Sequence, residues 1–400
     1  MLFSDRLIWE PPENELASAA REAAERHDLL DLTESNPTRV GLPYPTRAIG
    51  EALADGAASE YRPTPVGLPE AREAVAADYA RAGVTIDPER LLLTTSSSES
   101  YGFLFKLCCN PGEAVLVPEP SYPLFEYLAR LEGVEARGYR LAFDGDWHVD
   151  FASLEAAAEE TARAGRPARA VIAVSPNNPT GSYLKRRELS RLAAFCRATE
   201  MALIADEVFA PYPFGADPQR VVCAAAAPEA AEAPAVFSLG GLSKACGLPH
   251  LKVGWIALGG REARASLAAL ELIADTYLSV STPVQRALPR LLELGTAIRE
   301  AIAARVAANR AALQACLPPS SGCSILPCEG GWSAILRVPA SRTDAAWAVS
   351  LAREAGVLVH PGYFFEMRGG AFLVLSQLPP PATFVTATER VLAHIDSSLR

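Results

Sequence analysis

The sequence predicts an α/β fold, with a large and mostly parallel sheet flanked by helices and a second, smaller α+β domain. The first observation is a series of short apolar runs without polar–apolar alternation, which is typical of strands buried on both faces of a sheet. The second is that segments with helical spacing or turn-forming residues separate these runs. The third is a change of pattern near Pro283, where one long helical stretch precedes a few short strands.

The apolar runs define the expected strands of the large domain in chain order. The run Leu91–Thr95 is followed by apolar residues from Tyr101 to Cys108 that are spaced as on one face of a helix. The stretch 224–235 is rich in Ala, Pro and Glu and is expected to be a surface loop or a frayed helix. The remaining expected strands are Val115–Val117, Ala170–Val174, Ala202–Ala205, Ala235–Ser238 and Lys252–Leu258.

The smaller domain is expected at the two ends of the chain. A helical stretch from Pro283 to Leu317 is followed by short strands at Trp332–Val338 and Phe372–Ser376, with a helix between them. We therefore assign residues 45–282 to the large domain, and residues 1–44 together with 283–400 to the small one.

Composition excludes several classes of protein. Half of the 400 residues are hydrophobic and 21% are charged, which allows a large core and excludes a disordered or fibrous chain. The 37 Lys and Arg against 47 Asp and Glu give a net charge of −10, and there is no basic run. We therefore expect neither nucleic acid nor a membrane surface as a partner.

Targeting and metal signals are also missing from the sequence. Residues 1–12 lack the order of a signal peptide, and no apolar stretch is long enough for a membrane span. The eight cysteines form no CxxC pair, and the five histidines no HExxH motif. We expect reduced thiols, a cytoplasmic protein and no metal centre.

Polar residues directly follow four of the predicted strands. Ser96 and Ser97 open a helix, where backbone N–H groups and hydroxyls favour a phosphate, although serine N-capping is the simpler explanation of this cluster in isolation. Ser175–Gly181 contains ordinary turn formers. Its Asn178, however, is also expected at the carboxyl edge of a parallel sheet, where ligands bind.

The other two clusters contain a carboxylate and an amine. Asp206 ends a strand, where a carboxylate is costly unless it caps a helix or is paired, for example with a cationic ring nitrogen. Lys244 lies among small residues after Ser238, where desolvation would favour a nucleophilic amine. A solvated lysine in a glycine-rich loop is the simpler explanation of that motif in isolation, and neither a GxxxxGK[ST] nor a GxGxxG motif is present.

The order of the four clusters is more informative than any one of them. Together they supply a phosphate cradle, an amide, a carboxylate for a pyridinium and a Schiff-base lysine. Those are the groups that bind pyridoxal 5′-phosphate. The sequence therefore predicts an enzyme that uses this cofactor.

From about Leu32 to Ser376 the sequence resembles the class I/II aminotransferases, the aspartate-aminotransferase-like branch of the fold type I pyridoxal-phosphate enzymes. The resemblance rests on SPNNPTG, ADEVF, GLSK and KVGW in the family's order, together with the turn PSYP and the tripeptide GGW. It implies a seven-stranded sheet in the large domain. It also implies a homodimer with its active sites at the interface.

The resemblance also implies roles for individual residues. Lys244 should form the Schiff base and later move the proton, Asp206 should pair with the pyridine nitrogen, and Tyr122 should stack on the ring. Asn178 should bind the 3′-oxygen of the cofactor. The phosphate contacts should come from Ser96, Ser97, Ser243, Lys252 and, from the other subunit, Tyr61.

Four positions depart from the family's pattern. Phe209 stands where a tyrosine usually donates to the 3′-oxygen, and Gly241 where a serine usually binds the phosphate. Lys252 replaces an arginine, which keeps the charge and loses the bidentate fork. Val374 stands where an arginine usually binds the substrate carboxylate.

Val374 leaves two explanations open. Either the alignment slips by a few residues and Arg368 serves instead, or the carboxylate contact is absent or relocated, which we favour. Candidates for a relocated substrate contact are Asn36, Arg39 and Arg62.

Transamination between an amino donor and a keto or aldehyde acceptor, through pyridoxamine phosphate, is the function that this resemblance favours. The alternative keeps the fold and cofactor and changes the reaction to β/γ-elimination or substitution, decarboxylation or oxidative deamination. A third possibility is a sensor without catalysis, but the enzyme fold accounts for the whole chain, and such regulators usually carry a DNA-binding domain. The donor, the acceptor and the pathway do not follow from the sequence.

Overall fold

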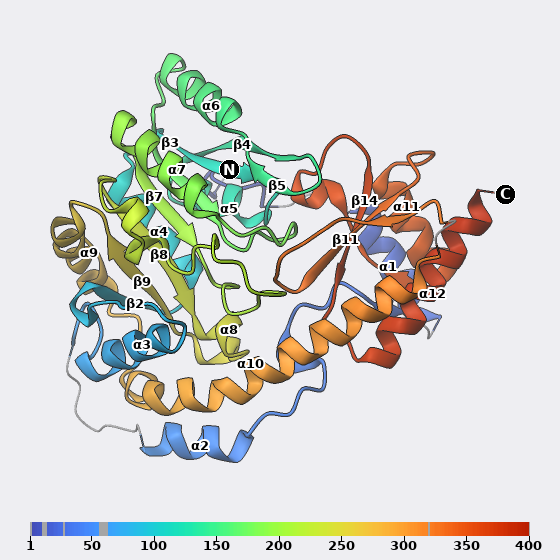
Figure 1. Cartoon of the computed structure of the whole chain (residues 1–400), viewed down its shortest axis with the longest axis horizontal. Coiled ribbons are helices and arrows are strands. Elements are labelled where there is room, and N and C mark those ends of the chain that lie inside the picture. The colour runs from blue at the N-terminus through green and yellow to red at the C-terminus, as the bar shows by residue number, and fades with distance from the viewer. Residues whose placement is uncertain (1, 10–13, 27–28, 56–62, 319–320, 400) are drawn as a thin grey trace.

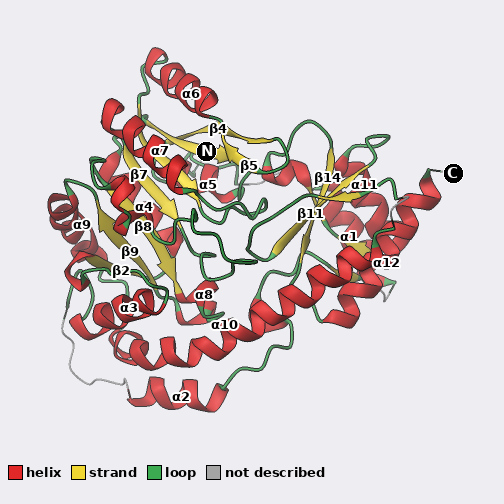
Figure 2. Cartoon of the chain, viewed as in Figure 1, coloured by secondary structure: helices red, strands yellow, loops and turns green. Residues whose placement is uncertain are grey.

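The computed structural model describes residues 2–9, 14–26, 29–55, 63–318 and 321–399. A large sheet with helices on both faces occupies one end of the molecule, and a second, smaller sheet lies at the other end (Figures 1 and 2). The predicted α/β class is confirmed. Among the described residues, no helix has both the length and the apolar character that crossing a bilayer requires.

The large sheet is built from strands spread over residues 91–259. In chain order they are β2 (Leu91–Thr94), β3 (Ala114–Glu119), β4 (Glu135–Phe143), β5 (Trp147–Val149), β6 (Ala168–Val174), β7 (Ala202–Asp206), β8 (Val236–Gly241) and β9 (Gly254–Gly259). Their order in the sheet is β2-β9-β8-β7-β6-β3-β4-β5. The pairs from β8 through β7, β6 and β3 to β4 are parallel, whereas β9 opposes both of its neighbours and β5 opposes β4.

Two details of the predicted sheet were wrong. Among the described residues the sheet has eight strands instead of seven, because the chain reverses after Phe143 and returns as the short strand β5, with Trp147 opposite Phe143. The sequence Asp-Gly-Asp between them favours such a reversal. Lys252, expected at the start of a strand, lies before β9 with a left-handed φ of 52°.

Helices cover both faces of the large sheet. Side chains such as Leu203 and Trp255 point to the face covered by α3, α6, α7 and α10, and side chains such as Ile204 and Ile256 to the face covered by α4, α5 and α9. The helices of this part are α2 (Thr46–Asp55), α3 (Pro69–Arg81), α4 (Ser97–Cys108), α5 (Leu124–Leu131), α6 (Phe151–Arg163), α7 (Arg186–Thr199), α8 (Leu242–Ala245) and α9 (Ala263–Tyr277).

The smaller sheet is antiparallel, in the order β10-β11-β14-β13. Leu32 packs in one core with the C-terminal residues Trp347 and Leu373, so the N-terminal and C-terminal segments meet there. The division at residues 45 and 283 stays a prediction. The elements are α1 (Glu15–Glu25), β1 (Leu30–Asp31), β10 (Ser324–Ile325), β11 (Ser333–Val338), α11 (Asp344–Ser350), β12 (Val357–Leu358), β13 (His360–Pro361), β14 (Ala371–Ser376) and α12 (Pro381–Ser398), and β1 pairs with β12.

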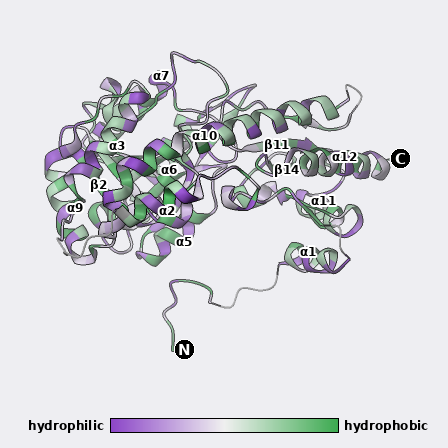
Figure 3. Ribbon diagram, turned by 90° about the horizontal axis from the view of Figure 1, so that it is seen from below, coloured by the Kyte–Doolittle hydropathy of each residue, from purple (hydrophilic) through white to green (hydrophobic). Residues whose placement is uncertain are grey.

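One helix, α10 (Thr282–Cys316), connects the two ends of the molecule. Pro283 lies in its first turn, where proline costs no hydrogen bond. The helix contacts α2, α3 and α8 along one part and α12 along another. Hydrophilic and hydrophobic residues alternate along α10 and α12 in Figure 3, as expected for helices with one buried side.

Candidate active site

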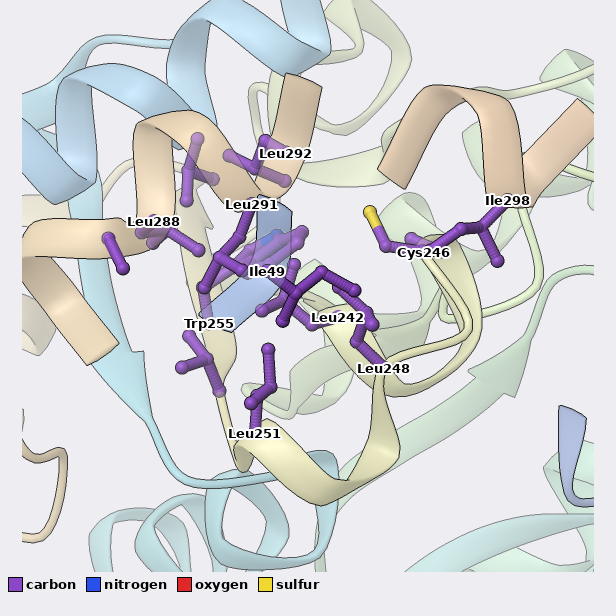
Figure 4. Close-up of a cluster of buried hydrophobic side chains, with 14 of the residues drawn as sticks. Ile49, Leu242, Cys246, Leu248, Leu251, Trp255, Leu288, Leu291, Leu292 and Ile298 are labelled. Atoms are coloured by element: carbon purple, nitrogen blue, oxygen red, sulfur yellow. The ribbon is translucent and has the colours of Figure 1, made fainter. Parts of the chain in front are cut away.

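The turn that carries Lys244 is fixed by the core beneath it. Leu242 and Cys246, two residues to either side of Lys244, are fully buried in a cluster with Ile49, Leu248 and residues of α10 (Figure 4). The hydroxyl of Tyr212 donates to the Lys244 carbonyl oxygen at 2.7 Å. Burial on both sides and this hydrogen bond hold the lysine backbone at the carboxyl end of β8.

The amine of Lys244 lies among aromatic rings. Its Nζ is 5.6 Å from the centre of the Phe209 ring and 5.4 Å from that of Trp332. Burial lowers the pKa of Lys244, and the nearby Asp206 carboxylate acts against this shift. A lowered pKa increases the fraction of neutral amine, which is the nucleophilic form.

Asp206 ends β7 and is held by two donors. The Tyr101 hydroxyl donates to Oδ2 at 3.0 Å, and the Val208 backbone N–H donates to Oδ1 at 3.2 Å. Burial raises the pKa of Asp206, and both hydrogen bonds and Lys244 act to lower it. The sequence predicted Tyr101 only as a residue of the buried helix face. Its role as partner of Asp206 depends on the packing of α4 against β7, which the pattern does not specify.

The start of α4 shows the predicted capping. The Ser96 hydroxyl accepts from the Glu99 N–H at 3.2 Å, and Ser97 is the first residue of the helix. Glu99 Oε2 accepts from the Thr95 N–H at 2.7 Å and from the Ser279 hydroxyl at 2.8 Å. Capping occupies the Glu99 N–H, which leaves the N–H groups of Ser97 and Ser98 in the first turn of α4 for a phosphate.

The segment Ser175–Gly181 connects the large sheet with the small one. Asn177 is buried and its Oδ1 accepts from the Ser121 hydroxyl at 2.7 Å, while Asn178 Oδ1 accepts from the Ser333 hydroxyl of β11 at 3.0 Å. Asn178 therefore lies between the carboxyl edge of the large sheet and β11. Tyr122, next to Ser121, has 48% of its surface exposed.

Val374 lies in an apolar environment. It pairs with Ile335 on one side and His360 on the other, two residues from the pair Ser333–Ser376. Residues two apart on a strand share a face, so Val374 is on the face from which Ser333 reaches Asn178. Val374 is 2% exposed and packs with Leu326, Ile335, Phe365, Met367 and Phe372, which we call the Val374 cluster.

The residues predicted to contact the substrate and the phosphate differ in solvent exposure and in their hydrogen-bond or ion-pair partners. Arg39 is exposed and paired with Glu34 at 3.4 Å, and Arg368 is exposed and paired with Glu119 at 3.0 Å. Asn36 caps a short 3₁₀ helix by accepting from the Thr38 N–H. Ser243 is half-buried beside Lys244, and Lys252 is exposed. Tyr61 and Arg62 lie outside the described residues.

The chemistry of these side chains fits pyridoxal phosphate. A desolvated amine, a carboxylate held for pairing and a serine-lined helix start lie at the ends of β8, β7 and β2. In addition, the Trp332 Nε1–H beside Lys244 is buried and has no hydrogen-bond partner among the described residues, so a donor is left over at this site. Together these features define the class of protein: an α/β enzyme that uses pyridoxal phosphate.

Comparison with known proteins agrees with this assignment. The model of the family "Aminotransferase class I and II" matches residues 27–375, so the chain belongs to that family and is a pyridoxal-phosphate-dependent aminotransferase. A valine–pyruvate aminotransferase of Mycobacterium tuberculosis is 28% identical over 95% of this chain and 94% of its own. Tyrosine aminotransferase of Bos taurus is 28% identical over 66% of this chain and 58% of its own.

Solved structures show the same fold. Alanine aminotransferase from Pyrococcus furiosus superposes with a TM-score of 0.83 at 22% identity, over 99% of this chain and 100% of that one. An aminotransferase from Escherichia coli superposes with a TM-score of 0.82 at 20% identity, over 99% and 98%.

Proposed function

We propose that this aminotransferase takes the amino group of an α-amino acid with an apolar side chain and transfers it to a keto acid. The observation that carries the proposal is that the Lys244 amine and the Asp206 carboxylate end adjacent strands, the first among aromatic rings and the second held by Tyr101. When bound, pyridoxal phosphate supplies an electron sink for negative charge at the donor's α-carbon. Lys244 would hold the cofactor and move the proton of that carbon, and Asp206 would keep the ring nitrogen protonated.

The other cofactor contacts are part of the same proposal. The start of α4, with Ser96 and Ser97, would bind the phosphate, and Ser243 and Lys252 would complete its shell. Asn178 would donate to the 3′-oxygen through Nδ2, since its Oδ1 already accepts from Ser333. Tyr122 would cover one face of the ring, and its exposed surface leaves that contact area available.

The Val374 cluster supports an apolar substrate group. A buried valine among apolar side chains offers no partner for a carboxylate, and burying one there unpaired would cost several kcal/mol or more. The apolar side chain of the donor would instead face this cluster. Its carboxylate would bind elsewhere, at Arg39 or Arg62. The relative from Mycobacterium tuberculosis, named for valine and pyruvate, agrees with an apolar donor.

We also propose a cytoplasmic homodimer. All eight cysteines are free thiols, as expected in a reducing compartment. The Ser279 hydroxyl reaches Glu99 at the start of α4, so the chain before α10 borders the proposed phosphate site, where the resemblance places Tyr61 of a second subunit. Sedimentation of the cofactor-loaded enzyme tests this. A fully active monomer at micromolar concentration would contradict it.

The reaction is tested by the visible spectrum of the cofactor-loaded enzyme during addition of amino donors without an acceptor. We expect branched and aromatic amino acids to bleach the absorption stably, and a keto acid to restore it. Product that accumulates without a keto acid would instead show elimination or decarboxylation.

Val374→Arg tests the substrate assignment in the same assay. An arginine there would be buried among apolar side chains at a cost, so we expect slower turnover of apolar donors and no gain with others. Arg39→Gln should raise KM for the donor. If Val374→Arg improved turnover of ordinary α-amino acids while loss of Arg39 and Arg62 changed nothing, the assignment would be wrong.

A further inference from the structure

A second pocket lies behind the turn that carries Lys244. It has a volume of about 330 Å³, which falls in the range of roughly 300–1,000 Å³ for small-molecule sites. Gly240, Gly241 and Ala245 contribute to its wall, but Lys244 does not. Glu207, the residue after β7, also lines it. Asp206 accepts from Tyr101 of α4 on one face of the sheet, whereas Glu207 accepts from the Ala224 N–H on the other face. The pocket is therefore separate from the cofactor site.

The walls of this pocket are largely apolar. Tyr79 and Trp255 meet edge to face with their ring centres 6.4 Å apart, and the indole N–H of Trp255 donates to the Tyr79 hydroxyl at 3.1 Å. Pro211, Pro213 and Val222 add further apolar surface to the lining. Val222 has 37% of its surface exposed, so the apolar wall is continuous with the opening to solvent. An aromatic or branched group of a ligand fits this surface.

Guanidinium groups outnumber carboxylates around the pocket. Asp78 pairs with both Arg81 at 3.0 Å and Arg299 at 3.1 Å, so one carboxylate serves two cations. Arg220 adds a third cation. It stacks on Tyr183, and its Nε–H is buried without a hydrogen-bond partner among the described residues.

Glu207 does not balance these charges. Its Oε1 accepts from the Ala224 N–H at 2.7 Å, and its Oε2 is buried without a hydrogen-bond partner among the described residues. Burial raises the pKa of Glu207 to about 8, so that the acid is mostly neutral near pH 7. The pocket thus combines an apolar wall with an excess of positive charge, and two buried polar atoms of its lining residues remain unpartnered.

We propose that this pocket binds a small organic monocarboxylate with an apolar body of about the size of a phenyl ring. The carboxylate would lie between Arg81 and Arg299, which share a single acidic partner, and the apolar body would pack on Tyr79, Trp255 and Val222. Ligand binding at this pocket would be a property separate from transamination, and the proposal does not depend on the proposed substrate. A ligand there would touch Gly240, Gly241 and Ala245, the backbone on both sides of Lys244.

The test uses 3-phenylpropionate, which has neither an amino nor a keto group and cannot be transaminated. Its binding to the cofactor-loaded enzyme is measured by titration calorimetry, and the part that Val222→Trp removes is assigned to this pocket. We expect millimolar or tighter binding. Val222→Trp, which fills the pocket, should abolish it. Arg81→Gln should weaken it about threefold, the size of an exposed charge pair.

Ala162→Trp on the exposed side of α6 is the matched control for a new tryptophan and should leave the affinity unchanged. All variants are checked for normal transamination. Undiminished binding by Val222→Trp, or no heat at about 10 mM probe, would overturn the proposal.

Discussion

The hydrogen bond from Tyr101 to Asp206 joins two buried side chains, and its removal has a defined consequence. A donor to the ionised carboxylate lowers its pKa, so in Tyr101→Phe we expect the pKa of Asp206 to rise. Such a hydrogen bond contributes about 1.5–3 kcal/mol, or about one to two pH units. The acid limb of the kcat profile should therefore move to higher pH.

Tyr139→Phe is the matched control for this change. Tyr139 is also buried, and its hydroxyl donates to the Ile172 carbonyl at 2.8 Å, away from the site. Tyr139→Phe should lower the free energy of unfolding without moving the acid limb of the kcat profile. Equal shifts in both variants would show that Tyr101 has only a structural role.

Phe209 gives a second prediction for a single residue. Phe209→Tyr restores a hydroxyl where the family usually donates to the 3′-oxygen of the cofactor, and a donor there favours the anionic oxygen. We expect the pH midpoint of the visible absorption of the loaded enzyme to fall. Phe214→Tyr, which changes another partly buried ring, should not move it. A midpoint that stays the same or rises in Phe209→Tyr contradicts the idea.

Among the elements, the close contact between α10 and the end of α8 limits the size of the side chain that fits at position 295. A Cβ at Gly295 of α10 would lie 2.4 Å from Cys246 Sγ and 2.6 Å from its Cβ, which is too close without a shift of the backbone. We expect Gly295→Ala to lower the free energy of unfolding by about 1–3 kcal/mol and to weaken cofactor binding, because Cys246 follows Lys244 by two residues. Urea unfolding and cofactor titration measure both effects.

Gly50 of α2 is the control for helix propensity. Nothing lies within 4 Å of a Cβ built there, so Gly50→Ala should raise stability by up to about 1 kcal/mol. If Gly295→Ala were equally stabilising, the close packing of α8 on α10 would not be what fixes the Lys244 turn.

The same elements show what sequence patterns can and cannot specify. Continuous apolar runs predicted β2, β3, β6, β7 and β8, because strands buried on both faces leave little choice of residue. β4 was missed because its Glu135–Phe143 mixes charged and apolar residues near the edge of the sheet. Lys244 and Asp206 were predicted as site residues because each follows a predicted apolar strand. Trp332 and Tyr101 reach the site from distant segments, and only the packing of those segments shows it.

For the molecule as a whole, the predicted division at residues 45 and 283 has a measurable consequence. Leu32 is buried in the core with Trp347 and Leu373, and Ile49 in the core with Leu242 and α10. Replacing either side chain by alanine should cost about 2–5 kcal/mol. If the two domains open separately, each substitution should speed hydrogen exchange only in its own part.

Leu32→Ala is then expected to speed exchange in β11 and β14, and Ile49→Ala in β2 and β9, as measured by mass spectrometry of the loaded enzyme. The outcome depends on α10, which contacts both parts and could couple them. Equal acceleration everywhere in both variants would mean that the helix makes the molecule one cooperative unit. In that case the boundary at residue 45 would not separate two independently unfolding domains. A destabilising change in the small sheet near Val374 would then also increase local opening around Lys244.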